Sequence, residues 1–320
     1  MRIIDIIDQN ISAGSCQFTF EVLPPLKGEG TSRIFSAIDT LAPLGPAYIN
    51  VTNQREAIKT EFDAEGNPRR RVYRHRPGTV GISAAIAKRY KIEVVPHIIC
   101  GGHSRYQIED LLIDLDFLGM HNVLALRGDG MKDERGFIPH PEGYAHADEL
   151  VEQIVAMNGG RFIDNEVEDC HRSKFCLGVA GYPEKHKESP DMESDIARLK
   201  AKVDAGGEYV VTQMFYDNAK FFDFVRRCRE AGIKVPIIPG IKPLSTTAQL
   251  DVLPKVFSIE IPEELERAAC KCKDSDAVKQ VGIEWATMQA AELKRAGLPI
   301  IHFYTMGRTE NVARIVKNVF

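Results

Sequence analysis

The chain has few cysteines and no long apolar run among its 320 residues. Seven cysteines, an odd and sparse number, exclude a disulfide framework and are typical of reduced thiols in a cytoplasmic protein. No apolar run approaches the roughly 18–20 residues that a membrane-spanning helix needs, so we expect no membrane association. The amino-terminal segment carries Asp5 and Asp8 within its apolar pattern, which favours a short amphipathic helix over a signal peptide.

An excess of charge of one sign is also missing. The 41 basic and 45 acidic residues leave a net charge of −4, which excludes the strongly basic surface of a nucleic-acid-binding protein at the level of the whole chain. The sequence has no Gly-Lys-Ser/Thr phosphate loop. Its segment 28–33 lacks the third small residue of a dinucleotide fingerprint and begins six residues past the first expected strand.

The sequence does contain an alternation of short apolar runs with longer segments of helical spacing. The runs are mostly continuous, as in parallel strands that are buried on both faces. They cover 18–22, 48–52, 93–99, 122–126, 175–180, 209–214, 235–239 and 300–304. Helices are predicted around 108–118, 192–204, 220–231, 263–272, 277–296 and 310–319.

Eight strand–helix units within 320 residues match the arithmetic of a (β/α)₈ TIM barrel of the α/β class with extra helices. We therefore predict a single barrel domain over residues 1–320. The alternative is an open, doubly wound sheet, which the strand count and the missing fingerprint disfavour.

Polar residues gather where the expected strands end, which is where TIM barrels place their functional groups. Glu21 lies among apolar residues and two prolines, and such neighbours raise the pKa of a carboxyl toward that of a proton donor near pH 7. A salt bridge at the barrel mouth is the alternative for Glu21. Arg127 and Asp129 flank Gly128, which lets the backbone approach a polar ligand; an ordinary ion pair in a loop is the alternative there.

A metal site is a weaker interpretation. His97, Cys100 and His103 form a His-x₂-Cys-x₂-His cluster. Strand alternation directs the first two to opposite faces, and no fourth ligand follows at zinc spacing, so we expect no metal. Cys100 as a nucleophile lacks a clear base beside it.

Eight motifs occur in one order between about residue 15 and residue 310, and together they are highly specific. The motifs are Phe-Glu-Val-Leu-Pro-Pro (20–25), Val-Thr (51–52), Pro-His-Ile-Ile-Cys (96–100), Leu-Arg-Gly-Asp (126–129), Val-Ala-Gly-Tyr-Pro-Glu-Lys-His (179–186), Asp-Ala-Gly…Thr-Gln-Met-Phe (204–215), Pro-Gly-Ile-Lys-Pro (239–243) and His-Phe-Tyr-Thr (302–305). With these motifs in this order, the chain resembles the methylenetetrahydrofolate reductase family, in its bacterial form that consists of the catalytic barrel only, without a separate regulatory domain.

The resemblance implies a flavoprotein oxidoreductase of one-carbon metabolism and methionine biosynthesis. NADH or NADPH would reduce FAD, and the reduced flavin would then pass hydride to 5,10-methylenetetrahydrofolate in a ping-pong reaction that yields 5-methyltetrahydrofolate. Glu21 matches the family's general acid, and Asp129 matches the carboxylate near flavin and pterin. The resemblance also implies a folate substrate and a homo-oligomer, with no nucleic-acid or membrane partner.

Further site residues come from the same resemblance. His146-Ala147 is the best match to a Tyr-Ala pair of the family, and Arg198 and Ala201 stand where an Asn and an Arg occur in some members. The positions implied to bind substrate are Gln213, Gln249, Tyr304 and Arg308. The positions implied to bind the cofactor are Thr52, His97, Arg127, Gly128, Asp129, His146, Ala147, Ala180, Tyr182, His186, Asp195, Arg198 and Lys202.

Two other functions stay open: a non-catalytic flavin- or folate-binding barrel, and a metal-dependent barrel hydrolase built on His97 and His103. The segment 54–78 is longer than in compact bacterial members and concentrates basic residues. It is expected to be a solvated loop, or else to receive polyglutamate tails or a nicotinamide phosphate. Its arginines are Arg69, Arg70, Arg71, Arg74 and Arg76.

Overall fold

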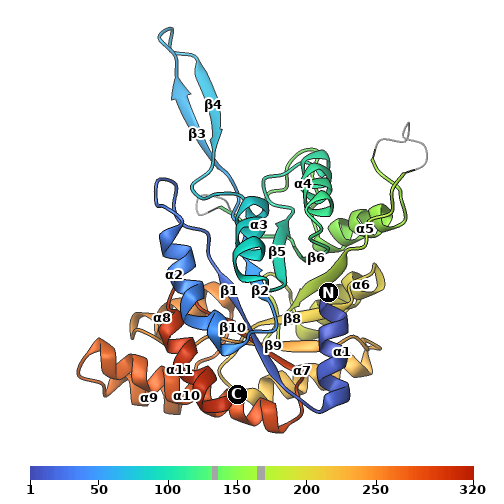
Figure 1. The fold of residues 1–320 in the computed structure, drawn as a ribbon. Coiled ribbons are helices and arrows are strands. Elements are labelled where there is room, and N and C mark those ends of the chain that lie inside the picture. The colour runs from blue at the N-terminus through green and yellow to red at the C-terminus, as the bar shows by residue number, and fades with distance from the viewer. Residues whose placement is uncertain (132–135, 164–169) are drawn as a thin grey trace.

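A closed barrel of eight parallel strands forms the centre of the computed structural model, which describes residues 1–131, 136–163 and 170–320 (Figure 1). Neighbouring strands follow the order β1-β10-β9-β8-β7-β6-β5-β2. The TIM barrel predicted from the sequence is thereby confirmed, and the doubly wound sheet was wrong. The strands are β1 (Gln17–Val22), β2 (Ile49–Val51), β5 (Val94–Ile99), β6 (Asn122–Leu126), β7 (Cys176–Gly181), β8 (Tyr209–Met214), β9 (Ile237–Ile241) and β10 (Ile300–Tyr304).

The predicted strands match these bounds closely, except that β9 begins and ends two residues after the predicted 235–239. The prediction ended the strand at a proline. Gly240 and Ile241 instead continue the ladder, since they pair with His302 and Phe303 of β10.

Helices surround the barrel (Figure 1), and those expected from spacing are present. The helix over Arg105–Phe117 begins with a capping box: the Ser104 hydroxyl accepts from the backbone N–H of Gln107, and the Gln107 side chain accepts from the Ser104 N–H. The helices are α1 (Ile3–Ala13), α2 (Ser32–Leu41), α3 (Thr79–Tyr90), α4 (Arg105–Phe117), α5 (Ala147–Asn158), α6 (Met192–Asp204), α7 (Asn218–Glu230), α8 (Ala248–Phe257), α9 (Glu263–Cys270), α10 (Ser275–Arg295) and α11 (Thr309–Val319), with a 3₁₀ turn at Ala42–Leu44.

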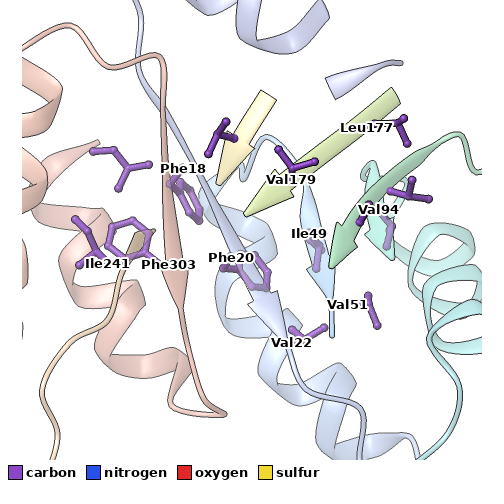
Figure 2. Packing of buried hydrophobic residues seen from close by; sticks show 14 of the residues in the cluster. Phe18, Phe20, Val22, Ile49, Val51, Val94, Leu177, Val179, Ile241 and Phe303 are labelled. Carbon is purple, nitrogen blue, oxygen red and sulfur yellow. The ribbon is translucent and has the colours of Figure 1, made fainter. Parts of the chain in front are cut away.

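The main hydrophobic core lies between the barrel and its helices, and it decides which way each strand residue points. Phe18, Phe20 and Val22 of β1 are buried in this cluster (Figure 2). Because successive side chains of a strand alternate, Thr19 and Glu21 face the barrel interior. The apolar neighbours of Glu21 in the sequence therefore fix the inward direction of its carboxyl group.

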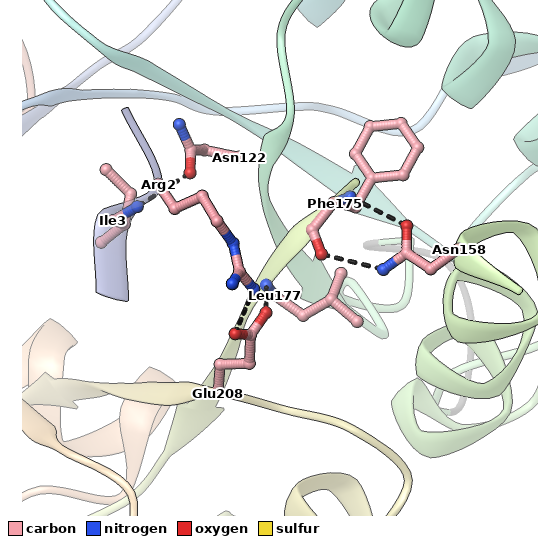
Figure 3. Close-up of polar contacts among 7 residues, drawn as sticks. All are labelled: Arg2, Ile3, Asn122, Asn158, Phe175, Leu177 and Glu208. Carbon is pink, nitrogen blue, oxygen red and sulfur yellow. Dashed lines mark hydrogen bonds and ion pairs between the residues drawn. The ribbon is translucent and has the colours of Figure 1, made fainter. Parts of the chain in front are cut away.

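A second cluster closes the amino-terminal end of the barrel beneath α1. Ile3 and Ile7 of α1 are fully buried there with Tyr48 and Tyr209. Polar contacts fasten the helix at its start (Figure 3): the Ile3 N–H donates to Asn122 Oδ1 at 2.9 Å, and Arg2 forms an ion pair with Glu208. The helix therefore covers the end of the barrel that is opposite to the strand carboxyl ends. No helix in the described ranges is long and apolar enough to cross a membrane.

The basic segment is not a plain loop, which corrects the prediction. It contains an antiparallel hairpin of β3 (Ala57–Phe62) and β4 (Pro68–Tyr73) that projects from the barrel (Figure 1). Asp63 holds its turn by accepting from the backbone N–H of Asn67 at 2.8 Å. Alternating residues before an Asp-x-x-Gly-Asn turn were the available signal. Acidic neighbours offset much of the basic charge, in the pairs Arg69–Asp63 (3.3 Å), Arg71–Glu61 (3.9 Å) and Arg74–Glu56 (2.5 Å).

Candidate active site

A cavity of about 470 Å³ opens where the barrel strands end at their carboxyl side, and it is lined by most of the predicted site residues. The catalytic, cofactor and substrate candidates thus meet in one place, although they come from segments spread over the whole chain. The predicted residues in its lining are Glu21, His97, Arg127, Gly128, Asp129, His146, Ala147, Ala180, Tyr182, His186, Asp195, Arg198, Lys202, Gln213 and Tyr304.

Glu21 supplies a buried carboxyl group to this cavity. Burial raises the pKa of Glu21 to about 7 because the charged form loses its hydration. Among the described residues, none donates a hydrogen bond to its side chain, while its backbone carbonyl accepts from Thr305 Oγ1 at 2.9 Å. A carboxyl group in this state can hold or release a proton near neutral pH.

Two buried histidines lie in the same lining. Burial lowers the pKa of both His97 and His302 to about 3, so both imidazoles are neutral at pH 7. His97 Nε2 and His302 Nδ1 have no hydrogen-bond partner within the described part of the chain. Unpartnered buried ring nitrogens beside a cavity are suited to a polar ligand that completes their hydrogen bonds.

Arg127 follows β6 and is held by a carboxylate and a ring. Its guanidinium forms two hydrogen bonds with Glu188, at 2.6 Å and 3.1 Å, and lies 4.7 Å from the centre of the Phe137 ring. The guanidinium lowers the pKa of the Glu188 carboxyl. This arrangement keeps a fixed positive charge at the cavity wall.

Lys202, from α6, is a second cation at the cavity. Its ammonium donates to the carbonyl of Ala180 and lies 5.9 Å from the centre of the Tyr182 ring. Burial lowers the pKa of Lys202 to about 8, and the charge of Asp195 opposes that shift. Asp195 in turn accepts from the hydroxyl of Ser189 at 2.7 Å. The wall formed by α6 therefore offers both a donor of variable charge and an acceptor.

The substrate candidates Gln213 and Tyr304 lie near the carboxyl ends of β8 and β10, which are separated in the barrel by β9. Gln213 Oε1 accepts from the Met214 N–H at 2.9 Å, which orients its amide. The hydroxyl of Tyr304 donates to the carbonyl of Thr212 at 2.6 Å. Both side chains are thus oriented by protein contacts before any ligand is considered.

Three predicted residues do not line the main cavity. Thr52 follows β2, and its hydroxyl donates to the carbonyl of Val22 at 3.4 Å. Gln249 and Arg308 line a separate hollow of about 20 Å³ that shares Tyr304 and Met306 with the cavity. Gln249 and Arg308 are therefore adjacent to the site, at its edge.

Several lining residues were not predicted as site residues. Sequence position gives no signal for Phe257 at the end of α8 or for Met306 after β10, because each is an ordinary apolar residue outside a motif. His302 belongs to a quoted motif, yet it was not assigned a role. The unpredicted part of the lining comprises Leu124, Ala125, Leu126, Asp148, Ser189, Ala201, Val211, Met214, Phe257, His302 and Met306.

Two of the three side chains in the His-x₂-Cys-x₂-His cluster have other contacts. His103 Nδ1 lies 3.1 Å from the carbonyl oxygen of Gly101, and Cys100 Sγ lies 3.5 Å from the carbonyl oxygens of Leu126 and His146. Within residues 1–131, 136–163 and 170–320, no group of three or more His, Cys, Asp or Glu side chains has the arrangement of a metal site. Among the described residues, His97 and His103 therefore belong to no ligand set that the hydrolase alternative could use.

Comparison with known proteins adds sequence relatives. The family model described as "Methylenetetrahydrofolate reductase" matches residues 6–320. Methylenetetrahydrofolate reductase (NADH) 1 of Arabidopsis thaliana is 31% identical over 333 residues, which cover 100% of this chain and 51% of the plant protein. The 5,10-methylenetetrahydrofolate reductase of Pectobacterium carotovorum subsp. carotovorum is 30% identical, over 93% of this chain and 88% of the relative. The chain spans about half the length of the plant relatives it matches.

Several solved structures share the fold over nearly the whole chain. One of them is an uncharacterized protein from Clostridium thermocellum, described as binding two copies of 5-methyl-5,6,7,8-tetrahydrofolic acid. It superposes with a TM-score of 0.57 over 98% of each chain, at 17% identity. At that identity the likeness shows the fold alone.

Proposed function

Because this chain belongs to the methylenetetrahydrofolate reductase family, we propose that it reduces 5,10-methylenetetrahydrofolate to 5-methyltetrahydrofolate with electrons from NADH or NADPH. The observation that carries the proposal is the buried Glu21 at the cavity, with its pKa raised to about 7. Binding alone does not need a proton donor in an apolar setting, so this carboxyl group disfavours the non-catalytic alternative.

The side chains of the cavity fit an FAD cofactor. Arg127 and Lys202 are cations suited to a pyrophosphate, and Asp195 is an acceptor suited to a ribose hydroxyl. The unpartnered His97 Nε2 can form a hydrogen bond with a polar group of the cofactor. Leu124 and Ala180 contribute apolar surface to the cavity lining. When bound, the flavin would take hydride from the nicotinamide and give it to the folate.

Glu21 would act on the folate. The five-membered ring of the folate opens when a proton is placed on the departing nitrogen. Glu21 holds that proton at neutral pH because the Glu21 anion is poorly solvated. The neighbouring His97 and His302 are neutral and have no such acidic proton at pH 7. Asp129 would stabilise the cationic, ring-opened substrate, and the amide of Gln213 would bind the pterin edge, since an amide both donates and accepts.

The first test is the colour and redox behaviour of the purified protein. We expect flavin absorbance that NADH or NADPH bleaches without oxygen, and that methylenetetrahydrofolate then restores. Stopped-flow measurement with each nicotinamide also decides between NADH and NADPH, which the sequence leaves open. A colourless protein that carries stoichiometric zinc would contradict the proposal.

Glu21→Gln separates the two half-reactions. Flavin reduction by nicotinamide should stay near the wild-type rate, because Glu21 has no proton to supply there. Folate reduction should fall by roughly 10²–10⁴-fold, which is the usual contribution of general acid catalysis. Anaerobic stopped-flow measures both rates. An equal loss in the two half-reactions would refute the general-acid role.

Three further expectations remain proposals. The small number of thiols supports a cytoplasmic location. Homo-oligomerisation is measured by light scattering of the purified protein. The single barrel over residues 1–320 is tested by whether the chain unfolds in one cooperative transition.

A further inference from the structure

We propose that Glu184 is a positioning residue that ties the loop after β7 to the end of α8 and thereby holds Phe257 in the cavity wall, an inference that rests on the proposed function. The loop after β7 supplies Tyr182 and His186 to the cavity. Phe257, the last residue of α8, also lines it. Glu184 is the group that joins these two walls.

Three segments meet at the Glu184 carboxylate. Its Oε2 accepts from the backbone N–H of Glu260 at 3.0 Å, across the gap between the two walls. Lys220, in the first turn of α7, has its ammonium 3.8 Å from the same oxygen and 2.8 Å from the Glu260 carboxylate. Only 6% of the Glu184 side chain is exposed, whereas the side chains of Lys220 and Glu260 are 39% and 77% exposed, so the Glu184 carboxylate is buried beneath partners that reach the solvent.

The chain that Glu184 holds follows a tight turn. Ser258, directly after Phe257, has φ +54° and ψ +45°, the left-handed conformation that residues other than glycine seldom adopt. Its N–H donates to the carbonyl of Pro254 at 2.9 Å, and Ile259 is buried in an apolar cluster. Glu260 lies two residues after the unfavourable conformation at Ser258. A contact at Glu260 can therefore hold this turn in place and keep Phe257 against the cavity.

The contact between the Glu184 carboxylate and the Glu260 N–H, called the tie below, is expected to depend on pH. Burial raises the pKa of Glu184 to about 7; the Glu260 and Asp217 carboxylates act in the same direction, while Lys220 and the Glu260 N–H oppose them. Glu184 Oε1 has no hydrogen-bond partner among the described residues. The ionised Glu184 carboxylate is therefore better solvated when its contact with the Glu260 N–H is broken. Breaking of this contact should become easier as the pH rises up through about 7.

The first arm of the test measures amide hydrogen exchange at Glu260, corrected for the intrinsic rate. Glu184→Ala removes the acceptor, and exchange should rise by about tenfold, as expected for the loss of one hydrogen bond worth about 1.4 kcal/mol. Glu184→Gln keeps an acceptor oxygen and should retain protection, but it should lose the wild-type increase in opening as the pH is raised from acid to neutral. Glu263→Gln, an exposed acid at the start of α9, is the matched control and should behave as wild type.

The second arm is kinetic. Glu184→Ala should raise the KM for methylenetetrahydrofolate by roughly tenfold with little change in kcat, because the groups that transfer the proton are untouched. If Glu184 acts through Phe257, the double variant Glu184→Ala/Phe257→Ala should have the same KM as Phe257→Ala alone.

The two arms distinguish the possible failures. Unchanged exchange at Glu260 in Glu184→Ala, or effects on KM that multiply in the double variant, would overturn the proposal. A protein that does not reduce the folate at all would refute the proposed function, and the exchange arm would still decide whether the tie exists.

Discussion

At the scale of single residues, burial moves the acids and bases of the cavity in opposite directions. It raises the pKa of Glu21 to about 7, lowers that of Lys202 to about 8, and lowers those of His97 and His302 to about 3. At neutral pH the carboxyl group therefore carries a proton more readily than either imidazole. Residue identity alone would have suggested histidine as the proton donor, and burial reverses that order.

Lys202 provides a test at this scale, through binding of the proposed cofactor FAD to the purified protein freed of any bound flavin. Its charge is present below its pKa of about 8 and is lost above it, so the affinity for the pyrophosphate should fall as pH rises through 8. Lys202→Met should weaken binding by about tenfold at pH 7, as for a buried charge-assisted contact, and should remove the pH dependence. Quenching of flavin fluorescence measures the dissociation constant.

Lys200 gives the matched control for that variant. It lies on the same helix, where its ammonium pairs with Asp204 at 2.7 Å on the surface. Lys200→Met should bind FAD like the wild type at every pH. If the two variants lose the same affinity, the Lys202 contact is not specific.

At the scale of elements, much of the barrel follows from the sequence because parallel strands buried on both faces are continuous apolar runs. Glu21, Arg127 and Gln213 could be placed at strand ends for the same reason. Phe257 could not, because it reaches the cavity through the path of α8 and not through any local pattern. The β3–β4 hairpin was missed because its charged alternation also suits a solvated loop.

Two glycines in helices should respond to alanine substitution with opposite changes in the free energy of unfolding. A methyl group on Gly81 of α3 would enter space that no other described residue fills, so Gly81→Ala should stabilise the protein by up to about 1 kcal/mol through helix propensity. Gly282 in α10 packs against Leu244, whose carbonyl oxygen a methyl group would overlap. Gly282→Ala should therefore lower the free energy of unfolding by about 1–3 kcal/mol or more. Denaturant titration measures both changes, and equal signs would contradict this account of the α10 packing.

At the scale of the whole molecule, the barrel is closed at one end by α1 and carries the cavity at the other. Ile7 is fully buried in the cluster beneath α1, while Ile11 on the same helix is 55% exposed. Ile7→Ala should lower the free energy of unfolding by about 2–5 kcal/mol, and Ile11→Ala should change it little. Urea denaturation compares the two. Similar losses would mean that α1 does not close the barrel by apolar packing.

The pairing of β1 with β10 joins the two ends of the sequence, since Gln17 lies beside Ile300 and Glu21 beside Tyr304. Contacts between residues so far apart are the slowest to form during folding, because a long loop must close first. While the chain is being synthesised, the strand that carries Glu21 must wait for β10 with one edge unpaired. A nascent chain of this protein therefore gains its shielded carboxyl group only when β10 pairs with β1, and until then it presents an open sheet edge with which another chain can pair.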